Sequence, residues 1–339
     1  MALEIYQRIQ DSLDKKRQNV TEFLESASET EREICLCDDE VDVQTHLHVI
    51  ETSLEKIGDK TLGICKICHG YVEPNQLEMD YTASICLDHY SPDDMRRLEA
   101  ELELSQIVQR ALLPQQLPNI QGVELAAFSR PSEIIGGDYF DFFKFKDGSQ
   151  GIVIADVSGH GVSAGMLMSG LQTALRTMAP DSNSPAEILE RINRFYIHNI
   201  NFTTFVTVFL ARFDPATRVL DYVNAGHNPP DLFRKQDGEI VWLMPTAAAV
   251  GLMEEYHPET KSVTLAEGDV LLLYTDGFTE AANSSGEAFG DERLDGLIRQ
   301  NAHLAVSDMI QVVRQNVSTF IENKPLQDDI TMIALKVSG

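Results

Sequence analysis

Basic residues are scarce in this chain of 339 residues, which has 27 Lys and Arg against 53 Asp and Glu and a formal net charge of -26. A charge of this sign repels nucleic acid backbones and anionic membrane surfaces at long range. Long apolar runs are also missing, because segments such as "DVLLLYTDG" end well short of the ~18 residues that span a bilayer. The composition therefore argues against nucleic acid and membrane partners.

Cysteine is absent from residues 91–339, since all five cysteines lie in the first 90 residues. This distribution indicates a separate N-terminal module that uses them. The first 20 residues mix charges throughout and lack the apolar segment of a secretory signal. We therefore expect a cytoplasmic protein whose thiols stay reduced.

Four residues of the N-terminal module have the spacing of a zinc site. Cys65 and Cys68 form C-x2-C, and 17 residues later Cys86 and His89 form C-x2-H. The two-residue gap lets both side chains of a pair reach one tetrahedral ion, and the short segment has few apolar residues to fold around. We predict one structural zinc at these four residues. Free reduced cysteines are the alternative interpretation, and His69 could replace His89.

The segment "LEKIGDKTLGICKICHGYVEPNQLEMDYTASIC" resembles the zinc finger of the DksA/TraR group, in which a helical hairpin leads into the finger. Apolar residues at helical spacing in residues 2–28 and 41–57 predict such a hairpin, with the acidic sequence "CLCDDE" at its bend. Members of that group can act on RNA polymerase. The tip and the short hairpin are too generic here to transfer that activity.

Two further cysteines lie at this bend. Cys35 and Cys37, together with His46 and His48, could form a second metal site or a redox pair. We favour exposed thiols beside an acidic turn, because C-x-C and H-x-H at this distance form no familiar ligand pattern.

Residues 92–113 are predicted to form one continuous helix. Ser91 can cap its start, and Pro114 marks its end. The apolar positions partly follow a heptad, which Ser105 and Gln109 interrupt. Two interpretations remain open: a weak coiled coil that would make the protein a homodimer, and a single helix that packs on the next domain.

From about residue 119 the sequence alternates between strand-like and helix-like segments. Short turns such as "FKDGSQG" and "FDPATRV" join several strand-like segments, which predicts antiparallel pairing. The pattern indicates an α/β sandwich, with helices near 162–178, 185–200, 291–300 and 305–321. The predicted strands are "VELAAFS", "YFDFFKF", "GIVIADV", "TFVTVFLARF", "VLDYVNA", "DVLLLYT" and "ITMIALKV".

Acidic residues stand at the ends of these predicted strands. Asp138 follows two glycines in "IIGGDYFDFF", Asp156 lies at the end of "GIVIADV", and Asp276 follows "DVLLLYT". Asp328 and Asp329 precede the last strand. Each residue alone is typical of a turn, but clustered carboxylates without a counter-charge would repel one another and become protonated. Together they predict divalent cations, and oxygen ligands favour magnesium or manganese over zinc.

Six motifs in this order carry a second resemblance: "GGDYFDFF", "ADVSGHGVSAGMLMS", "FVTVFLARFD", "NAGHNPP", "LLLYTDGFTEAAN" and "QDDITMIALKV". They resemble the SpoIIE/RsbU branch of the metal-dependent PPM-type serine/threonine protein phosphatases over residues 110–339. The resemblance implies a PPM-type α-β-β-α sandwich, preceded by a helical hairpin, a small zinc finger and a linker helix. The expected boundaries are 1–60, 61–90, 91–114 and 115–339.

This resemblance also implies the roles of the acidic residues. Asp138 and Asp156 would bind a pair of ions, with Asp156 as the bridge, and Asp276 and Asp328 would complete the other ion. The carbonyl of Val157 and the carboxylate of Asp329 are the remaining expected ligands. Two or three manganese or magnesium ions would then activate a water, whose hydroxide attacks phosphoserine or phosphothreonine.

Other positions depart from the family pattern. Typical PPM phosphatases have a histidine two residues after the metal-binding Asp, where this chain has Ser158. His160 follows two residues later, as a general acid or as part of a turn. For His227, in "NAGHNPP", a rigid loop near the site is favoured over a phosphate contact. Arg130 could clamp the phosphate, although a lone arginine before a proline is more often a solvated residue.

Two functions are compatible with these motifs. In the first, the chain is a phosphoprotein phosphatase that acts on a STAS-type anti-sigma factor antagonist in partner switching and is regulated by its zinc module and linker helix. In the second, it is a non-catalytic adaptor whose finger binds a transcription component. The presence of all four expected metal-binding aspartates favours the enzyme.

Overall fold

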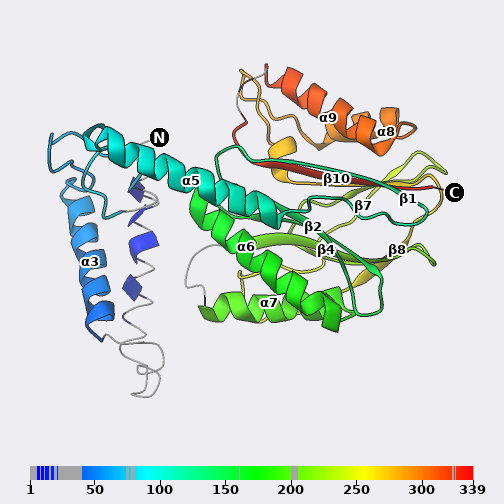
Figure 1. The fold of residues 1–339 in the computed structure, drawn as a ribbon, viewed down its shortest axis with the longest axis horizontal. Coiled ribbons are helices and arrows are strands. Elements are labelled where there is room, and N and C mark those ends of the chain that lie inside the picture. The colour runs from blue at the N-terminus through cyan, green and yellow to red at the C-terminus, as the bar shows by residue number, and fades with distance from the viewer. Residues whose placement is uncertain are drawn as a thin grey trace. The chain divides into compact units, whose positions relative to one another are not determined.

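A computed structural model of the chain describes residues 6–7, 9–10, 12–14, 17–18, 21, 40–73, 76–77, 81–159, 161–199, 205–322, 324 and 326–338 (Figure 1). The chain divides into two compact units, between Glu99 and Ala100. This division falls inside the predicted linker helix. None of the helices in the described ranges combines the length and the apolar character that crossing a membrane requires.

The first unit contains helix α3 (Glu40–Gly58) and the short helix η1 (Leu87–His89). The second helix expected for the hairpin, residues 41–57, is therefore confirmed. In the first helix expected for the hairpin, residues 2–28, Ile9 and Leu13 are helical and pack with Ile50 in a small apolar cluster. The same cluster contains the buried Cys65 and Cys86. The predicted bend with Cys35 and Cys37 lies outside the described residues, as do the side chains of residues 40–46.

Helix α5 (Pro92–Leu112) is the predicted linker helix. Its first turn is capped by Ser91, whose Oγ accepts a hydrogen bond from the backbone N–H of Asp94 (3.1 Å). Leu104, Ile107 and Val108 are exposed at 60%, 63% and 55% of their surface, so one side of the helix carries apolar groups that no described residue covers.

The second unit contains two five-stranded sheets in which all neighbouring strands are antiparallel. The order is β1-β10-β9-β6-β7 in one sheet and β2-β3-β4-β5-β8 in the other. The seven predicted strands are confirmed, and three short ones, β6, β7 and β8, are additional. The bounds are β1 Val123–Arg130, β2 Tyr139–Lys144, β3 Gln150–Val157, β4 Val206–Asp214, β5 Val219–Ala225, β6 Asp231–Phe233, β7 Ile240–Trp242, β8 Lys261–Thr264, β9 Val270–Tyr274 and β10 Ile330–Val337.

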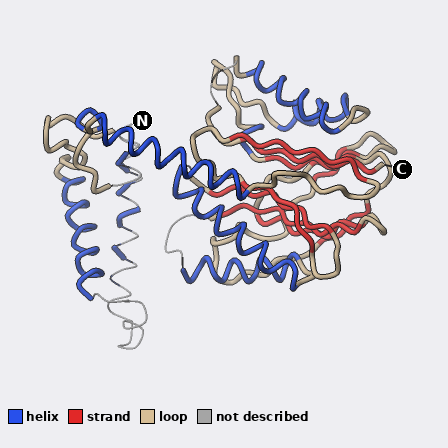
Figure 2. The backbone as a smooth tube through the Cα atoms, in the orientation of Figure 1, coloured by secondary structure: helices blue, strands red, loops and turns tan. Residues whose placement is uncertain are grey.

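Helices cover the outer faces of both sheets, which gives the expected α-β-β-α layers (Figures 1 and 2). Helices α6 (Gly161–Met178) and α7 (Pro185–Asn199) pack on the sheet of β2 to β5. Helices α8 (Asp291–Asn301) and α9 (Val306–Phe320) pack on the other sheet. One apolar core lies between the sheets, and one lies under each pair of helices.

The central strands are buried on both faces, which explains their continuous apolar sequences. In β10, Met332 contributes to the core under α8 and α9, whereas Ile333 contributes to the core between the sheets. The buried Asp141 of β2 is an exception. Its carboxylate accepts hydrogen bonds from Nε and Nη2 of Arg176 on α6 (both 2.6 Å), and this ion pair fixes α6 on the sheet.

A second buried acid, Asp231, lies at the start of β6 with 1% of its surface exposed. Neither of its carboxyl oxygens makes a hydrogen bond with a described residue. Burial, followed by the nearby Asp295 and Asp291, raises the pKa of Asp231 to about 8. Because its pKa is higher in the folded chain than in the unfolded chain, stability should fall as the pH rises from about 4 to about 8.

We therefore expect Asp231→Asn to flatten this dependence. The amide resembles the neutral carboxyl and cannot ionise, so the variant should match the wild type near pH 4 and exceed it by on the order of 5 kcal/mol near pH 8. Urea unfolding across this range, with magnesium in excess, measures the difference. Asp181→Asn, at an exposed position, is the control. Parallel curves for wild type and Asp231→Asn would contradict the prediction.

Candidate metal centre and active site

Both sheets place aspartates at the same end of the sandwich. Tyr139 pairs with Ala155, so Asp138 before β2 lies beside Asp156 near the end of β3. In the other sheet Tyr274 pairs with Met332, so Asp276 after β9 lies near Asp328 before β10. The antiparallel register thus brings together two aspartates in each sheet, and the charges of Asp276 and Asp328 act on Asp156 across the sandwich.

The mutual repulsion of these carboxylates shows in their pKa values. Burial, then the charges of Asp276, Asp328 and Asp329, raises the pKa of Asp156 to about 7. Burial, then the charge of Asp156, raises the pKa of Asp138 well above its usual value. Carboxylates this close are stable in their ionised form only with a cation among them. The donor set consists of oxygen atoms, which suits magnesium or manganese.

Glu280, which the sequence motifs did not single out, adds a further negative charge near Asp156 and Asp276. Its backbone N–H donates to the carbonyl of Asp276 (2.7 Å), and the charge of Glu280 contributes to the raised pKa of both Asp276 and Asp156. Glu280 stands four residues after Asp276 in "TDGFTE", a spacing that puts two side chains near each other in one helical turn.

Asp138 is held in place by a threonine pair that sequence reasoning did not identify. Oγ1 of Thr275 donates to Oδ2 of Asp138 (2.8 Å). The same Oγ1 accepts the backbone N–H of Thr331 (2.9 Å). The carboxylate of Asp138 is 7% exposed and is therefore oriented by a residue of the opposite sheet.

Asp329 is also an expected metal ligand, and both of its carboxylate oxygens accept hydrogen bonds from the loop before β2. Oδ1 accepts the backbone N–H (2.7 Å) and the hydroxyl (3.0 Å) of Ser132. Oδ2 accepts the backbone N–H of Gly137 (2.6 Å). Asp328 remains exposed, and its Oδ1 accepts the backbone N–H of Asp329 (2.8 Å). Asp329 thus fixes the loop that carries Asp138.

Three glycines of this site lie so close to other chain segments that a side chain would not fit. A Cβ on Gly137 would lie 3.0 Å from the carbonyl oxygen of Val157, an expected ligand. A Cβ on Gly136 would collide with the carboxylate of Asp329, and one on Gly277 would collide with the carbonyl oxygen of Asp329. The "GGD" and "DG" sequences therefore allow the two sheets to bring their acidic ends together.

Helix α5 contacts the same loop through Gln109, which is 9% exposed. Nε2 of Gln109 donates to the carbonyl of Gly136 (2.6 Å), and its Oε1 accepts the N–H of Gly136 (3.2 Å). Gln106 Nε2 also donates to the carbonyl of Ile134 (2.9 Å). Gln109, one of the two residues that interrupt the predicted heptad, therefore holds the helix on the loop before Asp138.

The remaining predicted residues fall in different places. Arg130 is exposed and lines a cavity of about 350 Å³ that reaches Asp138. Oγ of Ser158, just after β3, accepts the backbone N–H of Phe205 (3.0 Å), just before β4. His160 lies outside the described residues.

The ring of His227 is 2% exposed and contacts the hydroxyl of Thr207 (2.9 Å), and burial lowers its pKa to about 4. This position fits a rigid loop better than a phosphate contact.

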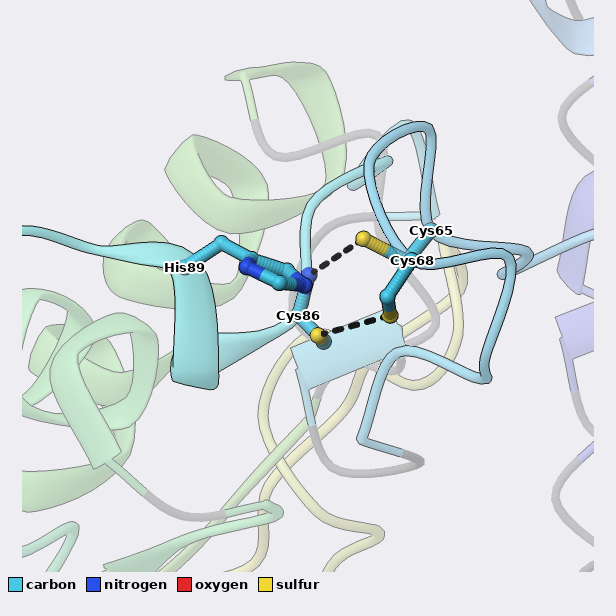
Figure 3. A group of neighbouring side chains, drawn as sticks. All are labelled: Cys65, Cys68, Cys86 and His89. Carbon is cyan, nitrogen blue, oxygen red and sulfur yellow. Dashed lines mark hydrogen bonds between the residues drawn. The ribbon is translucent and has the colours of Figure 1, made fainter.

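The first unit contains a separate candidate metal site. The ligand atoms of Cys65, Cys68, Cys86 and His89 all lie within 4.8 Å of one another, and the four side chains converge in Figure 3. Sγ of Cys68 and Sγ of Cys86 are 3.7 Å apart. The set includes His89 and not His69, in agreement with the C-x2-C and C-x2-H spacing.

Backbone N–H groups point at the sulfur atoms of this cluster. Cys65 Sγ accepts the N–H of Ile67 (3.4 Å) and of Cys86 (3.5 Å). Burial opposes ionisation of Cys65, but the backbone donors outweigh it and lower the pKa of its thiol. Burial and the neighbouring sulfur atoms raise the pKa of Cys86. Three thiolates can therefore coexist here only around a cation, and the donor set of three sulfurs and one imidazole suits zinc.

Similar proteins were found by sequence and by structure. The model of the family Stage II sporulation protein E (SpoIIE) matches residues 146–338, more than half of the chain. Phosphoserine phosphatase RsbU of Bacillus subtilis (strain 168) is 27% identical over 241 residues, which are 71% of this chain and 71% of RsbU. Phosphoserine phosphatase RsbP of the same organism is 29% identical over 189 residues, which are 54% of this chain and 46% of RsbP.

Among solved structures, the SiaA-PP2C domain of Pseudomonas aeruginosa superposes with a TM-score of 0.63 at 22% identity, over 71% of this chain and 98% of that domain. This likeness shows the fold of the second unit. The family match and the phosphoserine phosphatase relatives decide between the enzyme and the adaptor. The chain belongs to the SpoIIE family, as an RsbU-type PPM protein phosphatase.

Proposed function

We propose that the acidic end of the sandwich holds two or three magnesium or manganese ions. The convergence of aspartates from both sheets is the observation that carries this proposal. We place Asp329 beside the ions, as the residue that positions Asp138, because its oxygens already accept three close hydrogen bonds. The proposed ligands are Asp138, Asp156, Asp276 and Asp328 and the carbonyl of Val157.

The reaction that this site supports best is hydrolysis of phosphoserine or phosphothreonine on a regulatory protein. When bound, such ions lower the pKa of a coordinated water, so that hydroxide is available near neutral pH. The chain's own contribution is to hold several carboxylates at one point, where bound ions would keep them ionised. Thr275 and Asp329 maintain the geometry of Asp138, so the site is preorganised before the substrate arrives.

The substrate we propose is a phosphorylated STAS-type anti-sigma factor antagonist in a partner-switching system. Two relatives are named phosphoserine phosphatases, which supports a phosphoserine protein as the substrate class. The zinc module and α5 would regulate the site. Gln109 provides the physical link, because a shift of α5 would move the loop of Gly136 and with it Asp138. A homodimer formed through Leu104, Ile107 and Val108 could drive that shift.

The full chain should release phosphate from a phosphoserine STAS-type protein only when manganese or magnesium is present. Asp156→Asn should lower kcat on the order of a hundredfold or more, the scale of losing a major electrostatic contact with the transition state. Asp181→Asn changes the same charge at an exposed position and should retain the wild-type rate. Steady-state phosphate release measures all three. Metal-independent turnover in the wild type would refute the proposal.

The roles of Asp276 and Asp329 can be separated by stability without metal. Asp276→Asn removes repulsion, so in a chelating buffer near pH 8 it should raise the unfolding temperature. Asp329→Ala leaves buried N–H groups of Ser132 and Gly137 without an acceptor and should destabilise the protein by about 1–3 kcal/mol. Thermal unfolding with and without manganese measures both variants. Equal behaviour of the two would show that Asp329 is a ligand like the others.

We expect the purified chain to contain one zinc ion. Cys86→Ser should lose it, because a tetrahedral site needs all four ligands, whereas His69→Ala should keep it as the matched control. Elemental analysis by mass spectrometry measures zinc per chain. Loss of zinc in His69→Ala, with zinc kept in His89→Ala, would exchange the roles of the two histidines. A wild-type content near zero would leave free thiols as the correct interpretation.

A further inference from the structure

A second cavity of the catalytic unit, with a volume of about 360 Å³, lies between α9 and strand β1. Arg130, Arg314 and Lys324 line it, and no Asp or Glu is among the described residues that do so. The chain as a whole has about two acidic residues for each basic one, from its 53 and 27. Lys324 has an acidic partner outside the lining, Glu322, at 3.8 Å between Nζ and Oε2. Arg130 and Arg314 are therefore the two lining cations whose charge is contrary to that of the chain. We call this cavity the arginine pocket.

The arginines of this pocket are held near each other without a counter-charge. The guanidinium carbon of Arg314 lies 3.5 Å from the centre of the Phe128 ring, a cation–π contact that fixes it against β1. The guanidinium groups of Arg130 and Arg314 make no ion pair and no hydrogen bond with a described residue. Burial and then the charge of Arg130 lower the pKa of Arg314, so the two positive charges repel each other. An oxyanion between them would relieve this repulsion.

The pocket lies close to the candidate metal centre along the chain. Its lining includes Phe278, two residues after Asp276, and Ile330, two residues after Asp328. Arg130 also lines the cavity that reaches Asp138. A polypeptide whose phosphoserine reaches the metal centre would therefore have neighbouring residues near the arginine pocket, since a few extended residues span about 3.3 Å each.

We propose that the arginine pocket binds an acidic side chain of the substrate protein that flanks the phosphoserine. This inference rests on the proposed phosphatase function and adds a specificity site to it. Guanidinium groups bind carboxylate or phosphate oxygens bidentately. The apolar walls, Phe128, Phe278 and Ile330, would contact the methylene groups of a glutamate side chain, which a free inorganic anion lacks. A glutamate on a polypeptide would therefore contact both the arginines and the apolar walls of the pocket.

The test compares two phosphoserine peptides of equal length, with Glu or with Gln at the three positions on each side of the phosphoserine. The net charge of -26 alone would favour the Gln peptide, whereas the arginine pocket favours the Glu peptide. We expect the wild type to prefer the Glu peptide by about fivefold in kcat/KM, mainly through KM. Arg314→Gln should bring the ratio to one or below. Hydrolysis of p-nitrophenyl phosphate should stay unchanged, because this small ester does not reach the pocket.

Arg191→Gln is the matched control, because Arg191 is an exposed arginine of α7 in the other helical layer. It should retain the wild-type preference. A preference for Glu that survives in Arg314→Gln, or equal rates for both peptides in the wild type, would overturn the arginine pocket and leave the phosphatase intact. Absence of hydrolysis of every substrate, including p-nitrophenyl phosphate, would instead overturn the proposed function.

Calorimetry with a phosphate-free Glu peptide and with succinate distinguishes a polypeptide ligand from a free anion. Binding of the peptide that weakens in Arg314→Gln, with little binding of succinate, is the expected result. Binding of succinate that equals that of the peptide, with the same dependence on Arg314, would show that the pocket takes free carboxylates and would overturn its assignment to the substrate protein.

Discussion

The crowding of carboxylates at one end of the sandwich is the constraint on which the structure of the catalytic unit depends. Asp138 and Asp156 come from one sheet, and Asp276 and Asp328 come from the other. Without a cation their repulsion and burial act against ionisation, which is why the pKa of Asp156 rises to about 7. A divalent ion bound there, as we propose, would convert the repulsion between the sheets into a shared attraction.

The same end of the sandwich is also tied by neutral groups. Thr275 bridges Asp138 and Thr331, and Asp329 accepts backbone N–H groups from the loop before β2. These hydrogen bonds join the two sheets at this end of the sandwich. The charge of Asp329 adds to the crowding at Asp156, but both oxygens of Asp329 also accept hydrogen bonds, from Ser132 and Gly137. We therefore propose different roles for these residues: Asp329 positions the loop before β2, and the other four aspartates bind the ions.

The sequence predicted the seven long strands and the four strand-end aspartates, because periodicity and chain position carry that information. It did not predict β6 to β8, since strands of three or four residues leave no period to detect. The contact of Gln109 with Gly136 was also missed, because a glutamine within a heptad indicates only an interruption. Two acids side by side, Asp328 and Asp329, look equivalent in the sequence, and only their hydrogen bonds distinguish them.

A strongly acidic enzyme that acts on a phosphorylated protein must bring two negative partners together. The ions that we propose at the metal centre would solve this problem for the phosphate alone, because their field acts over a few ångströms and is screened beyond about 8–10 Å. The residues around a phosphoserine need their own favourable charges. Arg130 and Arg314 are the arginines placed to supply them, next to the chain segments that carry Asp276 and Asp328. The guanidinium groups of these arginines have no acidic partner among the described residues, so they complement the crowded carboxylates. We propose that the carboxylates bind cations and that the arginines bind an anion.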